Sequence, residues 1–244
     1  MPSKNRQREY ARRRHEKWLA HQAAARARRR RRRVIAAAVV GVLALVAAIV
    51  VVVDATRPEP LVDDGTTAAT REVPDASIAE GRAWTVELET SAGPLTLELD
   101  GAAAPQAVAS FVTLAEEGFF DGTRCHRLTT SGIFVLQCGD PTGTGSGGPG
   151  YRFGPVENPP SDDLYPAGTL AMARVGGDGA SMGSQFFLVY EDSTIPSDTA
   201  GGYTVFGRVV EGMDLLREIA DAGVVADGGQ TPAIEVTIER IELQ

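Results

Sequence analysis

An arginine and two glutamines lie in a strongly apolar setting in the second half of the chain. Arg127 is followed ten residues later by Gln137, at the end of an apolar stretch, and Gln185 directly precedes Phe186 and Phe187. These side chains are poor nucleophiles and poor proton carriers, because the guanidinium stays charged and the amides do not titrate. They are good fixed hydrogen-bond donors. The pattern therefore favours an apolar groove whose chemistry twists a bond without transferring a proton or a group.

A glycine-rich loop offers a competing interpretation. Gly143, Gly145 and Gly148 have the G-x-G-x-x-G spacing of dinucleotide-binding loops. That chemistry needs a helix immediately after the loop, to hold the pyrophosphate at its N-terminus, and the sequence continues instead with Pro149-Gly150. A P-loop needs a lysine, and residues 83–244 contain none. We therefore expect a structural loop.

His126 is the only histidine outside the N-terminal tail. A histidine-based metal cluster is therefore excluded, and no nucleophile-elbow pattern accompanies a serine–histidine pair. His126 also directly precedes Arg127 on a predicted strand, so the two side chains point to opposite faces. We predict a structural, hydrogen-bonded histidine and no cofactor or metal.

The elements that must position these residues occupy 83–244. A helical pattern begins at Pro105 and stops at Gly118, and a second covers 213–222. Short β patterns occur at 85–89, 95–99, 124–128, 133–138, 169–173, 185–189, 203–209 and 233–243. This content predicts a mainly β domain: a closed antiparallel eight-stranded β-barrel capped by two α-helices.

An uncharged run precedes this domain. Residues 34–53 are Val, Ala, Ile, Leu and one Gly. A helix of this length spans about 30 Å, the thickness of the hydrocarbon core of a bilayer. The alternative is a cleavable secretory signal, which has a shorter apolar region and a small-x-small cleavage site that residues 53–57 do not provide. We predict one uncleaved transmembrane helix.

The charges on the two sides of this run are opposite. Residues 1–33 carry fourteen Lys and Arg against two Glu, whereas 54–244 carry ten Arg and thirty acids. The positive-inside rule therefore predicts a single-pass protein of the cell membrane, with a basic cytoplasmic tail and an extracytoplasmic domain at 83–244. Residues 54–82 are rich in Pro, Gly, Thr and acids, which predicts a disordered tether.

The basic tail has two candidate partners. Arg28–Arg33 directly precede the apolar run, and this position favours contact with anionic lipid headgroups. Basic tails also bind nucleic acid without sequence preference. The position beside a predicted membrane span disfavours that alternative.

Cys125 and Cys138 are the only cysteines of the chain. An oxidising exterior would permit a disulfide between them. If Arg127 and Gln137 share one face of a regular hairpin, Cys125 lies on that face and Cys138 on the other, so a bridge would need a bulge. Two buried free thiols are the favoured expectation, and the bridged form stays open.

Five motifs together resemble the cyclophilin family of peptidyl-prolyl isomerases in their order and rough spacing. They are Cys125-His126-Arg127-Leu128, Phe134-Val135-Leu136-Gln137-Cys138-Gly139-Asp140, Met172-Ala173, Gly183-Ser184-Gln185-Phe186-Phe187 and Tyr203-Thr204-Val205-Phe206-Gly207. The resemblance covers about residues 83–244, and the opening hairpin, the Pro105 helix and the final strand agree with it.

The resemblance implies rotation of Xaa-Pro bonds, with no cofactor. Arg127 would direct its guanidinium at the prolyl nitrogen of the twisted amide, and Gln137 would hold a substrate carbonyl. The other implied binding residues are Phe134, Val135, Phe187, Ile195 and Tyr203 around the proline ring, Ala173 and Arg174 beside the preceding residue, and Gln185 in the groove.

Three departures from the family pattern matter. The spacing from Arg127 to Gln137 is longer than usual, which leaves the register of 129–133 open. Thr194 stands where the family often has tryptophan, and Tyr203 where it often has histidine, so the resemblance implies weak binding of cyclosporin. Arg174 replaces a usual asparagine, and we hypothesise that it favours an acidic residue before the proline.

These features predict a membrane-anchored isomerase of a bacterium, acting on prolyl bonds of secreted or membrane proteins as they fold. The alternative is a non-catalytic proline-peptide binding or chaperone module tethered to the membrane. A structural tether of the cell envelope is a third interpretation. Arg127 and Gln137 favour catalysis, because a binding module has little need of a buried guanidinium.

Overall fold

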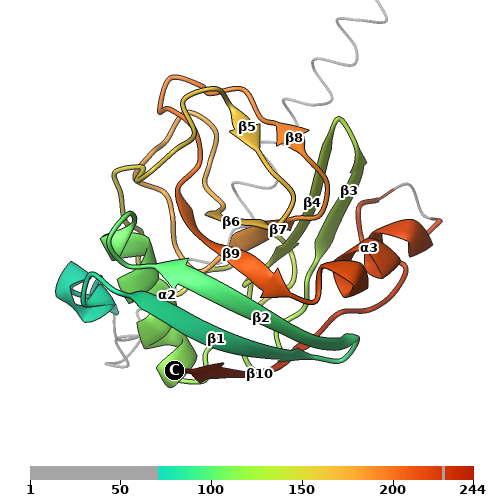
Figure 1. Cartoon of the computed structure of the whole chain (residues 1–244), viewed down its shortest axis with the longest axis horizontal. Coiled ribbons are helices and arrows are strands. Elements are labelled where there is room, and N and C mark those ends of the chain that lie inside the picture. Colours follow the sequence, from blue (N-terminus) through green and yellow to red (C-terminus); the bar gives the residue numbers. More distant parts are fainter. Residues whose placement is uncertain (1–70, 227–228) are drawn as a thin grey trace, which may run out of the picture. The chain divides into compact units, whose positions relative to one another are not determined.

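The structure is a computed structural model that describes residues 71–226 and 229–244 (Figure 1). Within these residues, eight strands form one antiparallel sheet and two short strands form another. The main-sheet strands are β1 (Ala83–Thr90), β2 (Gly93–Asp100), β3 (Arg127–Ser131), β4 (Ile133–Cys138), β6 (Thr169–Met172), β7 (Phe186–Val189), β9 (Val205–Glu211) and β10 (Ile238–Leu243). The other elements are η1 (Ala76–Ala79), α2 (Pro105–Glu116), β5 (Leu164–Tyr165), β8 (Ser193–Thr194) and α3 (Met213–Ala222).

Strict alternation of apolar and polar residues produces the opening hairpin of β1 and β2, as predicted. Trp84, Val86 and Leu88 are buried, while the residues between them are at least partly exposed. The two strands pair without interruption from Ala83, opposite Asp100, to the turn. One face of the hairpin therefore packs on the core, and the other faces solvent.

The sheet is not closed, so the predicted closed barrel is wrong. The strand order is β10-β1-β2-β9-β6-β7-β4-β3, which leaves β10 and β3 as its two edges. An isolated bridge between Arg124 and Thr237 joins the segments that precede these strands. Beside β3 itself, the carbonyl of Gln230 accepts a hydrogen bond from Leu128 N, so a loop occupies the place that β10 would need. The result is a curled half-barrel with two helices (Figure 1).

Strands β6 and β7, near the centre of the sheet, are buried on both faces. On one face, Met172 and Phe186 belong to the main core. On the other face, Ala171 and Phe187 belong to a second and smaller apolar cluster. Continuous apolar runs are typical of strands buried on both sides. The second cluster lies beside the candidate site described below.

Helix α2 contributes many buried residues to the main core. Pro105 stands at the first helical turn, where its missing N–H costs nothing. The ring of Phe111 lies 5.0 Å from that of Phe120, 5.5 Å from that of Phe186 and 5.7 Å from that of Phe206, measured between centroids. These contacts join the helix to β7 and β9.

The chain before β1 packs on the domain. Trp84 Nε1 donates a hydrogen bond of 3.0 Å to the carbonyl of the buried Ala79. Gln106 Nε2 of α2 donates one of 2.8 Å to the carbonyl of Pro74. Residues 71–82, which composition placed in the tether, therefore belong structurally to the domain.

The predicted membrane-spanning segment lies outside the residues that the structure describes. No helix within residues 71–226 and 229–244 is long and apolar enough to cross a bilayer. The predicted transmembrane helix at 34–53 and the basic tail at 1–33 lie outside the described residues. Both therefore stay predictions.

Candidate active site

Four side chains from distant parts of the sequence form one hydrogen-bonded row. Arg127 Nε donates to Gln230 Oε1 at 2.8 Å, and Arg127 Nη1 donates to Gln137 Oε1 at 3.1 Å. Gln137 Nε2 donates to Gln185 Oε1 at 2.8 Å, and Gln185 Nε2 donates to the carbonyl of Gly147 at 2.8 Å. The amides of Gln137 and Gln185 therefore have a defined orientation, because in each the oxygen accepts and the nitrogen donates.

Strand register brings the members of this row together. Arg127 of β3 lies directly opposite Gln137 of β4, which in turn lies opposite Phe187 of β7. Cross-strand partners point to the same face of a sheet. The register that the sequence left open over 129–133 is regular, and Gly132 makes the turn with φ 78°.

Arg127 and Gln137 keep N–H groups that the described residues do not use. A guanidinium has five N–H donors and a side-chain amide has two. The row uses two from Arg127 and one from Gln137. Arg127 is half-buried, so its remaining donors are accessible to a bound molecule while its position is fixed at two atoms.

The second apolar cluster lies beside the row. Its buried members are Val135, Tyr165, Ala171, Phe187, Val189 and Ile195, with Ile133, Ala173, Tyr203 and Val205 packed against them. Tyr203 N donates to Tyr165 Oη at 2.7 Å, and the Tyr203 ring lies 5.5 Å from that of Phe187 in an edge-to-face arrangement. The structure thus brings together five of the predicted binding residues: Val135, Ala173, Phe187, Ile195 and Tyr203.

Phe134 is not brought to this cluster. Side chains alternate along β4, so Phe134 points to the opposite face from Val135. Its ring lies 5.9 Å from that of Tyr190 and packs against the main core. Ile133 shares the face of Val135 and contacts the second cluster in its place.

Arg174 is fully engaged with the protein, and the hypothesis that it attracts an acidic substrate residue is wrong. Its side chain is 1% exposed, and Nη1 and Nη2 each donate to Asp198 at 3.0 Å. Nε donates to the carbonyl of Gly202, and the guanidinium lies 4.6 Å from the centre of the Tyr203 ring. The hydrogen bonds from Arg174 are the main cause that lowers the pKa of Asp198. The charge of Arg174 is therefore already neutralised.

The glycine-rich loop is held by a buried carboxylate. Asp140 accepts hydrogen bonds from Thr142 N at 2.7 Å and from Gly147 N at 3.1 Å. Burial raises the pKa of Asp140, but hydrogen bonds from Thr142, Gly147 and Gly145 outweigh this effect and lower it to about 2. A Cβ at Gly147 would lie 2.0 Å from Asp140 Oδ1, so only glycine fits. The loop thereby presents the Gly147 carbonyl to Gln185.

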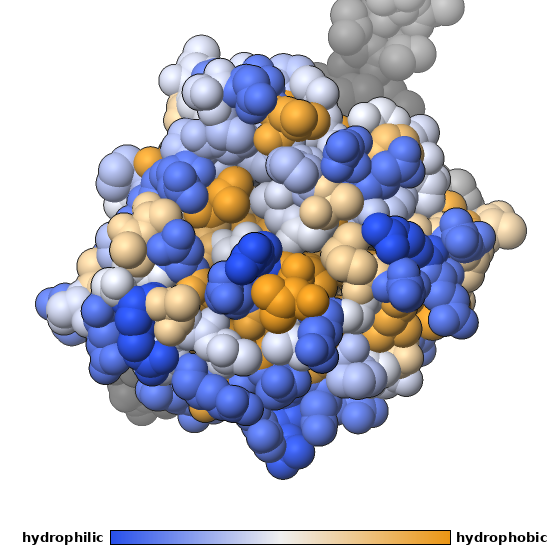
Figure 2. Space-filling model, in the orientation of Figure 1, coloured by the Kyte–Doolittle hydropathy of each residue, from blue (hydrophilic) through white to orange (hydrophobic). Residues whose placement is uncertain are grey.

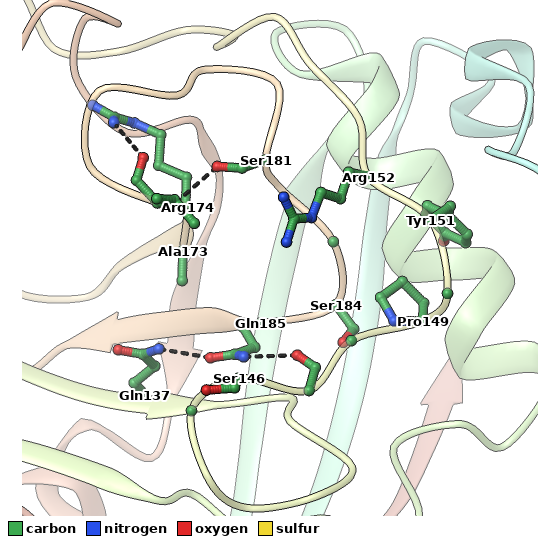
Figure 3. Close-up of a pocket in the computed structure, with 16 residues that line it drawn as sticks. Gln137, Ser146, Pro149, Tyr151, Arg152, Ala173, Arg174, Ser181, Ser184 and Gln185 are labelled. Atoms are coloured by element: carbon green, nitrogen blue, oxygen red, sulfur yellow. Dashed lines mark hydrogen bonds between the residues drawn. The ribbon is translucent and has the colours of Figure 1, made fainter. Parts of the chain in front are cut away.

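A pocket of about 770 Å³ adjoins the row (Figure 3). It shares Gln137, Gln185 and Ala173 with the row and the apolar cluster. The glycine-rich loop and the segment 181–185 form other parts of its wall. Figure 3 also shows Arg152, which the sequence did not single out, projecting into this space.

Cys125 and Cys138 form a disulfide, so the favoured expectation of free thiols is wrong. Arg127 is paired with Gln137, yet His126 N also donates to the carbonyl of Gln137 at 3.0 Å. The hydrogen bonding is therefore irregular at this point, although the bridge between Arg124 and Asp140 keeps the register of β3 and β4. This irregularity lies directly after Cys125 and before β3.

His126 takes no part in the hydrogen-bonded row. Its burial lowers the pKa of the imidazole, and the Asp140 carboxylate and the backbone of Arg124 oppose this effect only in part. The neutral ring therefore predominates at neutral pH. The prediction of a hydrogen-bonded ring is wrong, because Nδ1 and Nε2 are buried without a hydrogen-bond partner among the described residues.

Comparison with known proteins shows which family the chain is similar to. The family model described as cyclophilin type peptidyl-prolyl cis-trans isomerase/CLD matches residues 85–243. A Mycobacterium tuberculosis protein described as probable peptidyl-prolyl cis-trans isomerase B is 48% identical over 172 residues, which cover 65% of this chain and 54% of that protein. The chain thus spans about half the length of this relative.

Two further comparisons cover nearly the whole of the other protein. Peptidyl-prolyl cis-trans isomerase B of Bacillus subtilis is 40% identical over 133 residues, which cover 54% of this chain and 87% of that protein. The crystal structure of a Cryptosporidium parvum cyclophilin-type isomerase in the presence of the dipeptide Ala-Pro has a TM-score of 0.57 and 31% identity, and covers 66% of this chain and 98% of that one.

Proposed function

This chain belongs to the family of cyclophilin-type peptidyl-prolyl cis-trans isomerases, and from that premise we propose that its domain accelerates rotation about Xaa-Pro bonds. The observation that carries the proposal is the fixed Arg127–Gln137 pair, with unused donors, beside an apolar cluster. Rotation transfers no proton, so the lack of a titratable group in this row fits the reaction.

Amide resonance sets the barrier that the site must lower. The partial double bond between carbon and nitrogen gives a barrier of about 18–20 kcal/mol, and uncatalysed prolyl exchange takes roughly tens of seconds. Twisting the bond ends the resonance and leaves a lone pair on a pyramidal nitrogen. A catalyst must therefore bind this twisted form more tightly than either planar form.

Arg127 is the residue proposed to stabilise the twisted form. Its free N–H groups can donate to the prolyl nitrogen only after the lone pair has left the amide π-system. Gln230 and Gln137 hold the guanidinium at Nε and Nη1 before the substrate arrives. Preorganised donors of this kind need no rearrangement during the reaction. The interaction is made in the transition state, which is what raises the rate constant.

The neighbouring residues are proposed to hold the substrate on both sides of this bond. The unused N–H of Gln137 would donate to a substrate carbonyl. Phe187, Ile195 and Tyr203 would contact the proline ring, with Ala173 beside the preceding residue. Thr194 is exposed and offers little apolar surface, so weak binding of cyclosporin remains part of the proposal.

A non-catalytic binding module is the alternative, and two measurements on the same sample separate the two functions. The purified full-length chain is titrated into an Ala-Pro peptide, and NMR reports both binding and cis–trans exchange. Isomerisation predicts exchange far faster than that of the free peptide at substoichiometric protein. Binding without faster exchange would reject catalysis in favour of the binding module.

We also propose that the domain works outside the cytoplasm, anchored by residues 34–53. The uncharged run, the preceding Arg28–Arg33 and the Cys125–Cys138 disulfide support this location, because disulfides persist in oxidising compartments. The substrates would be secreted or membrane proteins, and the basic tail would contact anionic lipid. Protease added to intact bacterial spheroplasts that produce the chain should digest 83–244. Full protection of that domain would contradict the topology.

A further inference from the structure

Arg174 is buried, unlike the arginines of the other ion pairs among the described residues. The face seen in Figure 2 is largely hydrophilic, and the arginine side chains of those other pairs are 42% to 66% exposed. The side chain of Arg174 is 1% exposed. Withdrawing a guanidinium from water is costly unless its charge and its donors are satisfied. The contacts of Arg174 must therefore offset a cost that the surface arginines do not carry.

Those contacts lie almost entirely in the loop of residues 195–204, which joins β8 to β9. Nη1 and Nη2 of Arg174 each donate to the Asp198 carboxylate at 3.0 Å. Nε donates to the carbonyl of Gly202 at 3.0 Å, and Nη2 also donates to that of Gly201. The remaining N–H group donates to the carbonyl of the next residue in the chain at 3.2 Å. A guanidinium has five N–H donors, so none is left for a substrate.

The same loop carries two of the residues proposed to contact the proline ring. Ile195 begins the loop and Tyr203 stands near its end, and both belong to the second apolar cluster. The start of the loop is fastened separately, because Ile195 N donates to the carbonyl of Asp163 at 2.9 Å and Ser197 N donates to its carboxylate at 3.2 Å. Arg174 fastens the other end, through its hydrogen bonds to the two glycine carbonyls before Tyr203.

Arg174 also contacts the ring of Tyr203 itself. Its guanidinium lies 4.6 Å from the centre of that ring, a distance at which a cation is attracted to an aromatic face. The ring of Phe187 meets that of Tyr203 edge-to-face at 5.5 Å, and Tyr165 Oη accepts a hydrogen bond from Tyr203 N. The Tyr203 ring is therefore held by a cation, by a second ring and through its own backbone.

We propose that Arg174 is a positioning residue of the isomerase, which holds the loop and the face of Tyr203 so that the wall of the proline pocket is formed before the substrate arrives. The inference rests on the proposed isomerase function. Asp198 neutralises the charge of Arg174, so Arg174 acts through Tyr203 and not on the reacting bond. The proline ring must be held throughout the rotation, so the wall binds the planar and twisted forms alike. Loosening the wall should therefore raise KM and leave kcat unchanged.

The test measures KM and kcat for an Ala-Pro peptide with the full-length chain and its variants. Arg174→Met removes every donor and keeps an unbranched side chain. Asp198→Asn weakens the same contacts from the other side, and it replaces Arg174→Met if that variant does not fold. Arg174→Lys keeps a cation beside the ring with fewer donors. Arg208→Met is the matched control, because it breaks the surface ion pair with Glu98 and lies outside the loop.

Arg174→Met should raise KM about three- to tenfold, the value of one cation–π contact with its supporting hydrogen bonds. It should change kcat by less than about twofold. Asp198→Asn should shift KM in the same direction, Arg174→Lys should recover part of the loss, and Arg208→Met should keep the wild-type KM. In a Tyr203→Leu background, Arg174→Met should change KM by less than about twofold, because the ring on which Arg174 acts is missing.

Amide hydrogen exchange separates a local effect from a general loss of stability. Ala200 N donates to the Asp198 carboxylate at 2.8 Å, and Gly201 N donates to the Asp198 carbonyl at 3.0 Å. Both amides should exchange faster in Arg174→Met, while the amides of β7 keep their protection.

The outcomes separate this proposal from the function on which it rests. An equal rise of KM in the wild-type and Tyr203→Leu backgrounds, or a loss confined to kcat, overturns the positioning role while isomerisation stands. So does an unchanged KM in Arg174→Met, or in Asp198→Asn where that variant replaces it. A wild type that binds the peptide without isomerising it rejects the enzyme, and the same comparisons made on Kd then decide whether Arg174 positions the wall.

Discussion

Arg127 Nη1 donates a hydrogen bond of 3.1 Å to Oε1 of its cross-strand partner Gln137. The same guanidinium donates through Nε to Gln230, a residue 103 positions away in the chain. Arg127 is thus fixed from two sides, and the described residues leave its other donors unused. A residue in this position can act on a substrate without first being ordered by it.

Gln230 is expected to position Arg127 without touching the substrate. Gln230→Ala removes the acceptor at Nε, and the loss of one hydrogen bond should lower kcat/KM about three- to tenfold. Gln230→Glu keeps an acceptor and should retain more activity than Gln230→Ala. Gln230 is exposed, so thermal unfolding should show little change in stability for either variant. Equal activity of wild type and Gln230→Ala would remove the positioning role.

The disulfide should stabilise the domain by constraining its unfolded state. Cys125 and Cys138 are 13 residues apart, and a loop of this size predicts about 3 kcal/mol. Denaturant unfolding of the Cys125→Ser/Cys138→Ser variant should show a loss of this order. Reductant should destabilise the wild type and leave the variant unchanged. A wild type insensitive to reductant would contradict the bridge.

Phe186 and Phe187 are neighbours that face opposite sides of β7. Phe186 packs in the main core, and Phe187 packs in the second cluster. Either residue changed to leucine should cost about 1–2 kcal/mol of unfolding free energy. Only Phe187→Leu should also weaken binding of a proline peptide, as measured by titration. Equal loss of binding in both variants would show that stability alone is responsible.

Asp140 should make the domain sensitive to acid. Its pKa in the folded protein is about 2, below the ordinary value of 3.8, so the unfolded chain binds the proton more readily. The stabilisation is therefore complete above about pH 5 and disappears as the pH falls through 3.8 toward 2. The stability difference between wild type and Asp140→Asn should shrink over this range in denaturant unfolding. A constant difference would contradict the assignment.

His126 should give a second pH dependence of the stability. Burial lowers its pKa below the ordinary 6.5, so the unfolded chain again binds the proton more readily. Stability should fall as the pH drops through 6.5 toward the folded pKa, and it should be highest where the ring is neutral. His126→Asn should lack this component. Isomerisation should not depend on this titration, because the ring is outside the hydrogen-bonded row.

Local patterns in the sequence predict the parts of the fold that depend mainly on interactions between residues close together in the chain. The hairpin around Thr85–Leu99, the Pro105 helix and strands β4 and β7 follow from alternation, a proline start and continuous apolar runs. Arg127 and Gln137 could be paired in advance because strand alternation places them on one face. Closure of the sheet into a barrel could not be predicted in this way, because it depends on which distant segment pairs with the edge strand β3.

The remainder of the site could not be predicted because it depends on distant contacts. Nothing near Gln230 in the sequence indicates that its amide meets Arg127. Arg174 resembles a free specificity residue until Asp198, 24 positions away, is seen to neutralise it. Ile133 could have been chosen over Phe134 from the period of two ending at Gln137. The irregular hydrogen bond from His126 N to Gln137 could not, because it forms only when the two segments pair.

The claim that Arg127 stabilises the twisted amide is tested most directly by separating binding from turnover. Exchange NMR on an Ala-Pro peptide gives both quantities for the wild type, Arg127→Ala and Arg127→Lys, with folding of each variant checked by its spectrum. The account predicts that Arg127→Ala lowers kcat by about 10²-fold or more and changes Kd by less than about threefold. Arg127→Lys should recover little, because a lysine lacks the fork held by Gln230 and Gln137. An Arg127→Ala variant with weakened binding and unchanged kcat would contradict the account.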